Sequence, residues 1–320
     1  MNKNNILAID LGGTSAKVGI IDFQGKVLFN FIVDNQIDNI LQNLFQKIME
    51  KLKEQKISYQ ELECVGFSTA GFVDHQEGIV KIAGNLNWFD FNLKEEAEKI
   101  FQKKVIVLND ANAAALGEFW IGSGKKYKSV LFYTLGTGIG GAIIINGNLV
   151  EGQHGYAGEF GHGGDMQHDI DCNCGLKHCI EPTTSAVGLS KAIKLYWKKH
   201  PQDSTIKYFK NPQNVEMVDI ARVYFENNNP QDLKELIIKI YKPLLNHMAL
   251  MIKALDPEAI LIGGGGSKMG RALLDIISCG LKPLILPIYF KDLKLETAQL
   301  GNDAGIIGAA YFAKKIIEGE

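Results

Sequence analysis

Cysteine, long apolar runs and net charge are all scarce in this 320-residue sequence. There are only five cysteines, and because no secretory signal precedes the chain we do not expect them to form a disulfide framework. No apolar run approaches the ~18 residues that a membrane span needs, so we expect no membrane partner. The formal net charge is -2, so the sequence has no excess of the positive charge that nucleic-acid-binding proteins carry. The first residues, MNKNN, lead into an expected strand without a signal peptide, and we therefore expect a cytoplasmic protein.

The length and the hydrophobic content of 46% are enough for two domains with substantial cores. Short apolar runs at residues 6–9, 16–21 and 27–33 predict three strands in an opening β-meander. Apolar residues then recur at helical spacing from Ile37 to Leu52, with Asp34 or Asn35 as the expected N-cap. Alternating strands and helices follow, which indicates an α/β fold.

The second half of the chain repeats the opening pattern. A strand over residues 129–135, a glycine loop and a strand over residues 142–145 are followed by the hairpin signal Asn146-Gly147. This weak internal repeat predicts two related α/β domains, each with one glycine-lined loop. The remaining expected elements are strands at residues 64–68, 105–108 and 259–262, a helix beginning near Ala111, mostly helical sequence over residues 189–251 and a final helix at residues 304–317.

Three of the five cysteines lie close together, at Cys172, Cys174 and Cys179. One His with three Cys is a soft ligand set that suits a four-coordinate structural zinc. A disulfide is the alternative, but neighbours separated by one residue pair poorly, and we expect a reducing compartment. His162, His168 and His178 are all candidates for the fourth ligand. Cys64 and Cys279 lie in apolar segments, where we expect them to pack in the core.

Two glycine loops bear on ligand binding. Gly136-x-Gly138-x-x-Gly141 matches a dinucleotide-binding pattern, which requires a helix after the loop. Here an expected strand follows, and we therefore reject that interpretation. The loops are either plain hairpin turns or anion sites, where exposed backbone N–H groups approach phosphate. A Thr in each loop, Thr14 and Thr137, favours phosphate.

Asn109-Asp110 stands where a strand ends and a helix begins, the edge at which ligands gather in α/β folds. Asp110 is either the helix N-cap or a carboxylate that takes a proton from a substrate hydroxyl. Asn and Glu side chains on nearby loops suit a polyhydroxylated ligand.

These motifs together resemble the ROK family of sugar kinases and repressors, in the actin/hexokinase-like superfamily. The resemblance covers most of the chain. It is carried by residues 10–14 and 135–141 as phosphate motifs, residues 263–267 as an adenosine motif, residues 109–114 as a catalytic stretch, and residues 158–162 and 172–181 as a zinc and sugar segment. It implies a two-domain α/β fold of ribonuclease H-like type with a cleft between the domains.

The resemblance also implies the chemistry: Asp110 would be the general base that deprotonates a sugar hydroxyl attacking the γ-phosphate of ATP. The residues that it implies for the sugar are Gly71, Asn85, Asn109, Asp110, Glu159, His162 and Glu181. Those that it implies for ATP and Mg²⁺ are Asp10, Gly12, Gly13, Thr14, Lys17, Thr137, Gly138, Gly264 and Gly265. The implied zinc ligands are His162, Cys172, Cys174 and Cys179, with His162 also facing the sugar.

The resemblance further implies a homodimer and three segments: an N-terminal domain at residues 1–118, a larger domain at 119–302, and a C-terminal helix at 303–320 that packs back on the first domain. The family's Pro-Gly is Ala70-Gly71 here, its Pro-Asn is Gly84-Asn85, and its Gly before the last cysteine is His178.

The implied function is an ATP-dependent hexose kinase, with glucokinase favoured. A kinase for N-acetylmannosamine or N-acetylglucosamine is the alternative within that class. A sugar-sensing repressor is a second class, but only nine residues precede Asp10, too few for a helix-turn-helix. A zinc-binding interaction module is a third class, and it would leave Asp110 and the paired glycine loops without a role.

Overall fold

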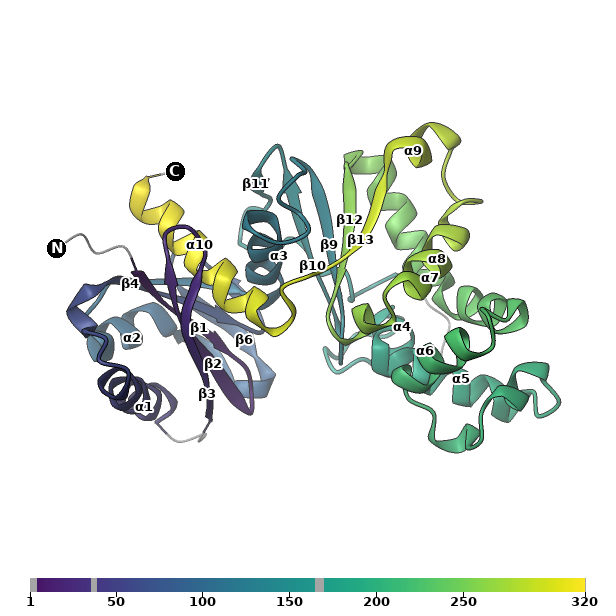
Figure 1. Ribbon diagram of the computed structural model, residues 1–320, viewed down its shortest axis with the longest axis horizontal. Helices are drawn as coiled ribbons and strands as arrows, with labels where there is room; N and C mark the ends of the chain where they lie inside the picture. Colours follow the sequence, from purple (N-terminus) through teal and green to yellow (C-terminus); the bar gives the residue numbers. More distant parts are fainter. Residues whose placement is uncertain (1–4, 36–38, 165–169, 320) are drawn as a thin grey trace. The chain divides into compact units, whose positions relative to one another are not determined.

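The structure is a computed structural model that describes residues 5–35, 39–164 and 170–319. It divides into two compact units (Figure 1). The first combines the chain up to Lys126 with Leu149–Ala157 and the segment from Gln299 onward, and the second combines Tyr127–Asn148 with Gly158–Ala298. The sequence analysis predicts domain boundaries after residues 118 and 302, and those boundaries remain a prediction.

The first unit is built on a five-stranded sheet in the order β3-β2-β1-β4-β8. The antiparallel trio β1-β2-β3 is the predicted meander, and β4 and β8 run parallel to β1. β1 and β4 are buried almost throughout, whereas the edge strand β3 alternates between half-buried and exposed residues, because only one of its faces is covered. The strands are β1 (Asn5–Leu11), β2 (Ser15–Asp22), β3 (Val27–Asp34), β4 (Leu62–Thr69) and β8 (Val105–Asn109).

Helices cover both faces of this sheet. Alternate residues of β1 point to opposite faces, so Leu7 and Ile9 pack with α1 and α2, while Ile6 and Ala8 pack with α10. The final helix α10 also lies along α3 and β4 (Figure 1). The helices of this unit are α1 (Ile40–Glu54), α2 (Leu93–Phe101), α3 (Asp110–Trp120) and α10 (Ala304–Glu318), with short 3-10 turns at η1 (Tyr59–Glu61), η2 (Gly84–Leu86) and η6 (Gly301–Asp303).

The predicted N-cap of the first helix is wrong. Helix α1 begins at Ile40 with Asn39 as its N-cap, and Asp34 is still the last residue of β3. Ile37, where the helical spacing begins, lies outside the described residues. Asn35 instead supports the first glycine loop, as described below.

A second, three-stranded antiparallel sheet in the first unit was not predicted. Its order is β5-β6-β7. β5 has only three residues, too few to show an alternating pattern. The strands are β5 (Phe72–Asp74), β6 (Ile79–Ala83) and β7 (Trp88–Asn92).

The second unit repeats the topology of the first, with the strand order β11-β10-β9-β12-β13. Again an antiparallel hairpin leads into central strands that run parallel, β9 beside β12 and β12 beside β13. The predicted internal repeat is therefore confirmed in the order of the strands. They are β9 (Val130–Leu135), β10 (Ile139–Ile145), β11 (Asn148–Leu149), β12 (Ala259–Gly263) and β13 (Lys294–Thr297).

Helices in the second unit bury a large apolar core that includes residues of α5 to α8. No helix among the described residues combines the length and apolar character of a membrane span. The helices of the second unit are α4 (Glu181–Thr184), α5 (Ala186–Lys199), α6 (Met217–Glu226), α7 (Gln231–Leu255), α8 (Arg271–Leu281) and α9 (Pro287–Asp292), with 3-10 turns η3 (Ser204–Tyr208), η4 (Pro212–Asn214) and η5 (Gly265–Met269).

The two cysteines outside the cluster differ from each other. Cys64 is buried in β4, as predicted. Cys279 is exposed, so its predicted core position is wrong. Helix α8 is amphipathic, and it buries Ile276, Ile277 and Gly280 while turning Cys279 toward solvent.

Helices α3 and α10 approach so closely that no side chain fits at their contact. A Cβ atom on Gly308 would lie 1.6 Å from the carbonyl oxygen of Ala113, and one on Gly117 would lie 2.5 Å from that of Ala304. Both obstacles are backbone atoms, which cannot rotate away. Glycine is therefore required at both positions.

We predict that Gly308→Ala destabilises the protein by at least about 2 kcal/mol, because overpacking against fixed backbone outweighs the better helix propensity of alanine. Gly280→Ala in α8 is the matched control, since its new methyl would meet only the end of the Leu245 side chain. Calorimetric unfolding measures both variants. An equal effect in the two would contradict the close-contact argument.

Candidate functional site

Polar side chains end the three parallel strands of the first unit. Strand register sets Asp10 of β1 beside Ser68 of β4, and Thr69 of β4 beside Asn109 of β8. The carboxyl ends of parallel strands meet at one edge of the sheet, which is where α/β folds bind ligands. Asp10, Asn109 and Asp110 therefore lie along one edge of this unit.

Asp10 is a half-buried carboxylate that accepts a hydrogen bond of 2.8 Å from the Ser68 hydroxyl. The net effect of its surroundings raises the pKa of Asp10 to about 6: burial is the main cause, the Ser68 hydrogen bond opposes it, and the charges of Asp110 and Lys17 raise and lower the pKa by smaller amounts. A desolvated carboxylate of this kind suits a hard cation such as Mg²⁺. Lys17 forms an ion pair of 2.6 Å with Asp303, so the structure places its ammonium on that carboxylate.

The N-cap of α3 is Asn109. Its side-chain oxygen accepts hydrogen bonds from the N–H groups of Ala111 and Asn112, at 2.9 and 3.1 Å, and its amide nitrogen donates to the Gly71 carbonyl at 3.0 Å. Asp110 is thereby the first residue of the helix rather than its cap. Its side chain keeps solvent contact, yet desolvation raises its pKa. One of its carboxylate oxygens accepts the Ala111 N–H at 2.8 Å, and the residue is exposed at the start of α3.

Gly71 and Asn85 lie near the same edge. Gly71 has φ of 104°, and a Cβ atom there would lie 2.1 Å from the Ile82 carbonyl oxygen, so glycine is required. Asn85, in η2, packs against Gly13, where an added Cβ would lie 2.9 Å from the Asn85 Cβ. One predicted sugar residue thus touches the first glycine loop.

The first glycine loop is the turn between β1 and β2, closed by a 3.0 Å hydrogen bond from the Gly12 N–H to the Ser15 carbonyl. Thr14 is exposed at its tip. Asn35 supports the loop from the side, because its amide donates to the Gly12 carbonyl at 2.6 Å and its N–H donates to the Thr14 carbonyl at 2.9 Å. Sequence reasoning missed Asn35 and Ser68 in these roles. The meander register, which pairs Ser15 with Asp34, is the signal for Asn35.

The second glycine loop is likewise the turn of a hairpin, between β9 and β10. A strand follows it, and the rejection of a dinucleotide-binding loop is confirmed. The Gly140 N–H donates to the Thr134 hydroxyl at 3.1 Å, and the Ile139 N–H donates to the Glu181 carboxylate at 2.9 Å. Thr137 is exposed at the tip.

The third glycine run lies beside this second loop. Gly264 has φ of 74°, and a Cβ atom there would lie 2.8 Å from the backbone of Leu135, directly before the loop. A Cβ atom on Gly265 would meet only open space. The second unit thus brings Gly264 and Gly265 to the same end of the sheet as Thr137 and Gly138.

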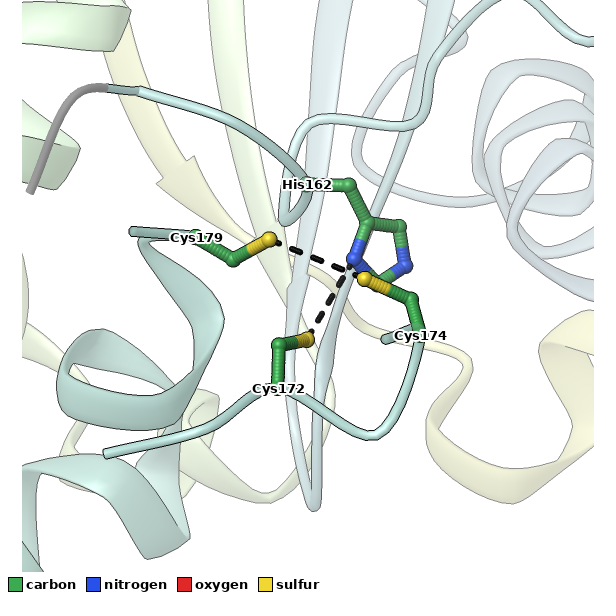
Figure 2. A group of neighbouring side chains, drawn as sticks. All are labelled: His162, Cys172, Cys174 and Cys179. Carbon is green, nitrogen blue, oxygen red and sulfur yellow. Dashed lines mark hydrogen bonds between the residues drawn. The ribbon is translucent and has the colours of Figure 1, made fainter. Parts of the chain in front are cut away.

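His162, Cys172, Cys174 and Cys179 form a compact cluster whose potential ligand atoms all lie within 4.8 Å of one another. Figure 2 shows the four side chains pointing toward one another. The Cys172 sulfur lies 3.7 Å from His162 Nδ1, and the sulfurs of Cys174 and Cys179 lie 3.7 Å apart. A tetrahedron of Zn–S bonds near 2.3 Å has edges of about 3.8 Å. None of these three cysteines forms a disulfide, and the donor set and spacing fit zinc.

The imidazole in the cluster is that of His162. His178 is exposed, with φ of 65°. His168 lies outside the described residues. The Gly163 N–H donates to the Cys179 sulfur at 3.2 Å. Burial, reinforced by the neighbouring thiols, raises the pKa of the Cys172 thiol to about 12, an effect that a divalent metal offsets by binding thiolate.

Two carboxylates lie against the cluster. Glu159 Oε2 is 3.8 Å from His162 Nε2, the ring nitrogen opposite the one that faces Cys172. Glu181 Oε1 is 3.7 Å from the Cys172 sulfur, while its other oxygen accepts the Ile139 N–H. The cluster therefore positions Glu159, His162 and Glu181, and Glu181 joins it to the second glycine loop.

The raised pKa of Asp10 gives a prediction on stability. Its carboxyl holds a proton more tightly when folded than when unfolded, where the pKa is 3.8, so its contribution is fully favourable below pH 3.8 and is lost as the pH rises through about 6. Asp10→Asn should therefore increase the free energy of unfolding by about 1–3 kcal/mol at pH 8 and change it little at pH 4. Urea denaturation at both pH values measures this. The exposed control Asp292→Asn should show no such difference, and equal effects of Asp10→Asn at both pH values would contradict the prediction.

Comparison with known proteins agrees with this geometry. The family model described as "ROK family" matches residues 6–316. The chain is 31% identical to a glucokinase of Thermotoga maritima, over 100% of both chains, and 34% identical to one of Halalkalibacterium halodurans, over 97% of this chain and 94% of that one. It superposes with a TM-score of 0.77 and 29% identity on a ROK family glucokinase from Streptomyces griseus, solved with glucose and AMPPNP, covering 97% of this chain and 99% of the other. The chain therefore belongs to the ROK family.

Proposed function

We propose that the protein is an ATP-dependent hexose kinase, and specifically a glucokinase (EC 2.7.1.2) that phosphorylates the 6-hydroxyl of glucose. The observation that carries the proposal is the placement of Asp110. Asn109 caps α3, which leaves the Asp110 carboxylate at the first helical position with solvent contact and a raised pKa. The glucokinases of T. maritima and H. halodurans, similar over nearly the whole chain, support glucose as the substrate.

Asp110 acts as the general base in this proposal. A base contributes most when its pKa approaches the working pH, and desolvation shifts Asp110 in that direction. It accepts the proton of the sugar hydroxyl as that oxygen attacks the γ-phosphorus. The other residues contribute by positioning the two substrates and by stabilising the charge on the transferred phosphoryl group, because this kind of phosphoryl transfer leaves the protein little covalent chemistry to perform.

The remaining residues bind the two substrates. The proposed sugar-binding residues are Gly71, Asn85, Asn109, Glu159, His162 and Glu181. The proposed ATP-binding residues are Gly12, Gly13, Thr14, Lys17, Thr137, Gly138, Gly264 and Gly265, with Asp10 for Mg²⁺. Thr14 and Thr137 are exposed at the tips of the two glycine loops, and backbone N–H groups at such turns suit phosphate oxygens. The AMPPNP bound to the S. griseus glucokinase supports ATP as the phosphoryl donor.

The Cys/His cluster is the proposed site of a structural zinc held by His162, Cys172, Cys174 and Cys179. Bound there, the metal would fix the loop by closing four ligands around it, with no open position for chemistry. His162 keeps its second ring nitrogen toward Glu159, on the sugar-binding segment. We also propose a homodimer and a cytoplasmic location, the latter because the three thiolates must stay reduced to bind metal.

We predict ATP-dependent ADP release with glucose, and a loss of at least ~100-fold in turnover for Asp110→Asn, which keeps the shape but removes the base. The assay includes mannose, fructose, N-acetylglucosamine and N-acetylmannosamine beside glucose. Thermal unfolding of the variant checks that it folds.

Other outcomes of this assay separate the alternatives. Preference for an N-acetylated sugar would keep the mechanism and change the substrate. Sugar binding without turnover on any of the five would favour a non-enzymatic sugar-sensing protein. Near-normal turnover of Asp110→Asn would remove Asp110 from its role as the base.

We predict that Cys174→Ser releases most of the zinc and lowers kcat/KM for the sugar by about 10–100-fold, because the segment bearing Glu159 and Glu181 loses its support. Metal analysis of the purified variant and steady-state kinetics measure the two effects. Cys279→Ser is the matched control, since that thiol is exposed outside the cluster. One zinc per chain retained in Cys174→Ser would count against the ligand set.

A further inference from the structure

Glu118, two turns after Asp110 in α3, is completely buried. Among residues 5–35, 39–164 and 170–319, it is the only charged residue in the buried class. A buried carboxylate is costly unless hydrogen bonds replace its water shell. The proposed chemistry assigns Glu118 no role, so its placement needs another explanation.

Four neutral donors surround this carboxylate. Oε1 accepts the N–H groups of Gln299 and Leu300, at 2.8 and 2.7 Å. Oε2 accepts the N–H and the hydroxyl of Ser123, at 2.9 and 3.1 Å. A Cβ atom on Gly122 would lie 2.1 Å from Oε2, so the chain bends around the carboxylate where a side chain would collide with it. Each oxygen thus binds a different segment.

These two segments are two of the four connections between the units, and the other two flank Leu149–Ala157. Ser123 lies just before Lys126, the last residue before the chain enters the second unit. Gln299 is the first residue after the chain returns from it for the second and last time. One carboxylate therefore fastens both connections to helix α3. The same helix begins at Asp110, about 12 Å away along its axis.

We propose that Glu118 is a positioning residue for phosphoryl transfer: it fixes both connections to the helix that carries the general base. The inference rests on the proposed function. At these two connections, any movement of the second unit relative to the first must be absorbed by residues beyond the anchored points, so α3 and Asp110 keep their geometry while the two connections bend. Displacement of a reacting group by about 1 Å can cost 100-fold in rate, which is why such anchoring matters.

Glutamine tests the carboxylate at constant shape. In Glu118→Gln one oxygen becomes an NH₂ group that faces two donors, so one connection loses its acceptor. Ser123→Ala is the matched control, because it removes one hydroxyl donor and leaves the other three bonds. We expect kcat to fall at least ~10-fold in Glu118→Gln. We expect the KM values for ATP and hexose to change less than ~3-fold, because Glu118 touches neither proposed binding set, and Ser123→Ala to stay within ~3-fold of the wild type in every constant.

Hydrogen exchange gives a readout that does not depend on activity. In Glu118→Gln, exchange should accelerate at Ser123 or at Gln299 and Leu300, while β9 and β12 exchange as in the wild type. Unchanged exchange in both connections would overturn the proposal. So would accelerated exchange with unchanged kcat, since Glu118 would then be only structural.

Two further cases are covered: a Glu118→Gln variant that does not fold, and a wild type that phosphorylates no hexose. If Glu118→Gln does not fold, Glu118→Asp keeps the charge on a side chain one methylene shorter, which cannot reach both connections; it should show the same loss of kcat, and a normal kcat would overturn the proposal. If the wild type phosphorylates no hexose, the proposed function has failed. Exchange then decides on the anchor alone: acceleration in a connection supports it, and none overturns it.

Discussion

The close backbone contact between α3 and α10 is the constraint on which the first unit depends. Gly117 and Gly308 let the helices touch without intervening side chains. The start of α10 lies against Asp10, since a Cβ atom on Gly305 would fall 2.5 Å from its carboxylate. The start of α3 carries Asp110. Two segments almost 200 residues apart in sequence thus set the positions of Asp10 and Asp110, two of the acidic groups of the proposed site.

Much of the fold is readable from the sequence, because its strands and helices carry their own periodic patterns. The meander of β1 to β3 and its repetition in β9 to β11 follow from short apolar runs separated by glycine turns. The sheet of β5 to β7 is not predicted from the sequence, and its first strand, Phe72–Asp74, has only three residues, too few to show an alternating pattern. Cys279 was misplaced because an apolar stretch does not reveal which face of a helix is covered until its neighbours are known.

The candidate site is readable only in part, for a related reason. Glycine loops and clustered cysteines are local signals that motifs capture, and the structure brings His162 together with the three thiols. The side chains that support these motifs are contacts across long sequence distances. Ser68 lies 58 residues from Asp10, and Gln299 lies 181 residues from Glu118. Such pairs depend on strand register and helix packing, which no single segment encodes.

The discontinuity of the first unit has a consequence for its synthesis. One face of its sheet is covered by Ile306, Ile307, Ala310 and Ala313 of α10, the last helix of the chain. A ribosome makes the whole of the second unit before those residues exist. Until α10 has been synthesised, apolar residues such as Ile6 and Ala8 on this face of the first unit's sheet remain uncovered. By then all residues of the second unit have been made. The first unit, whose synthesis begins first, therefore completes its core only after the second unit has been made.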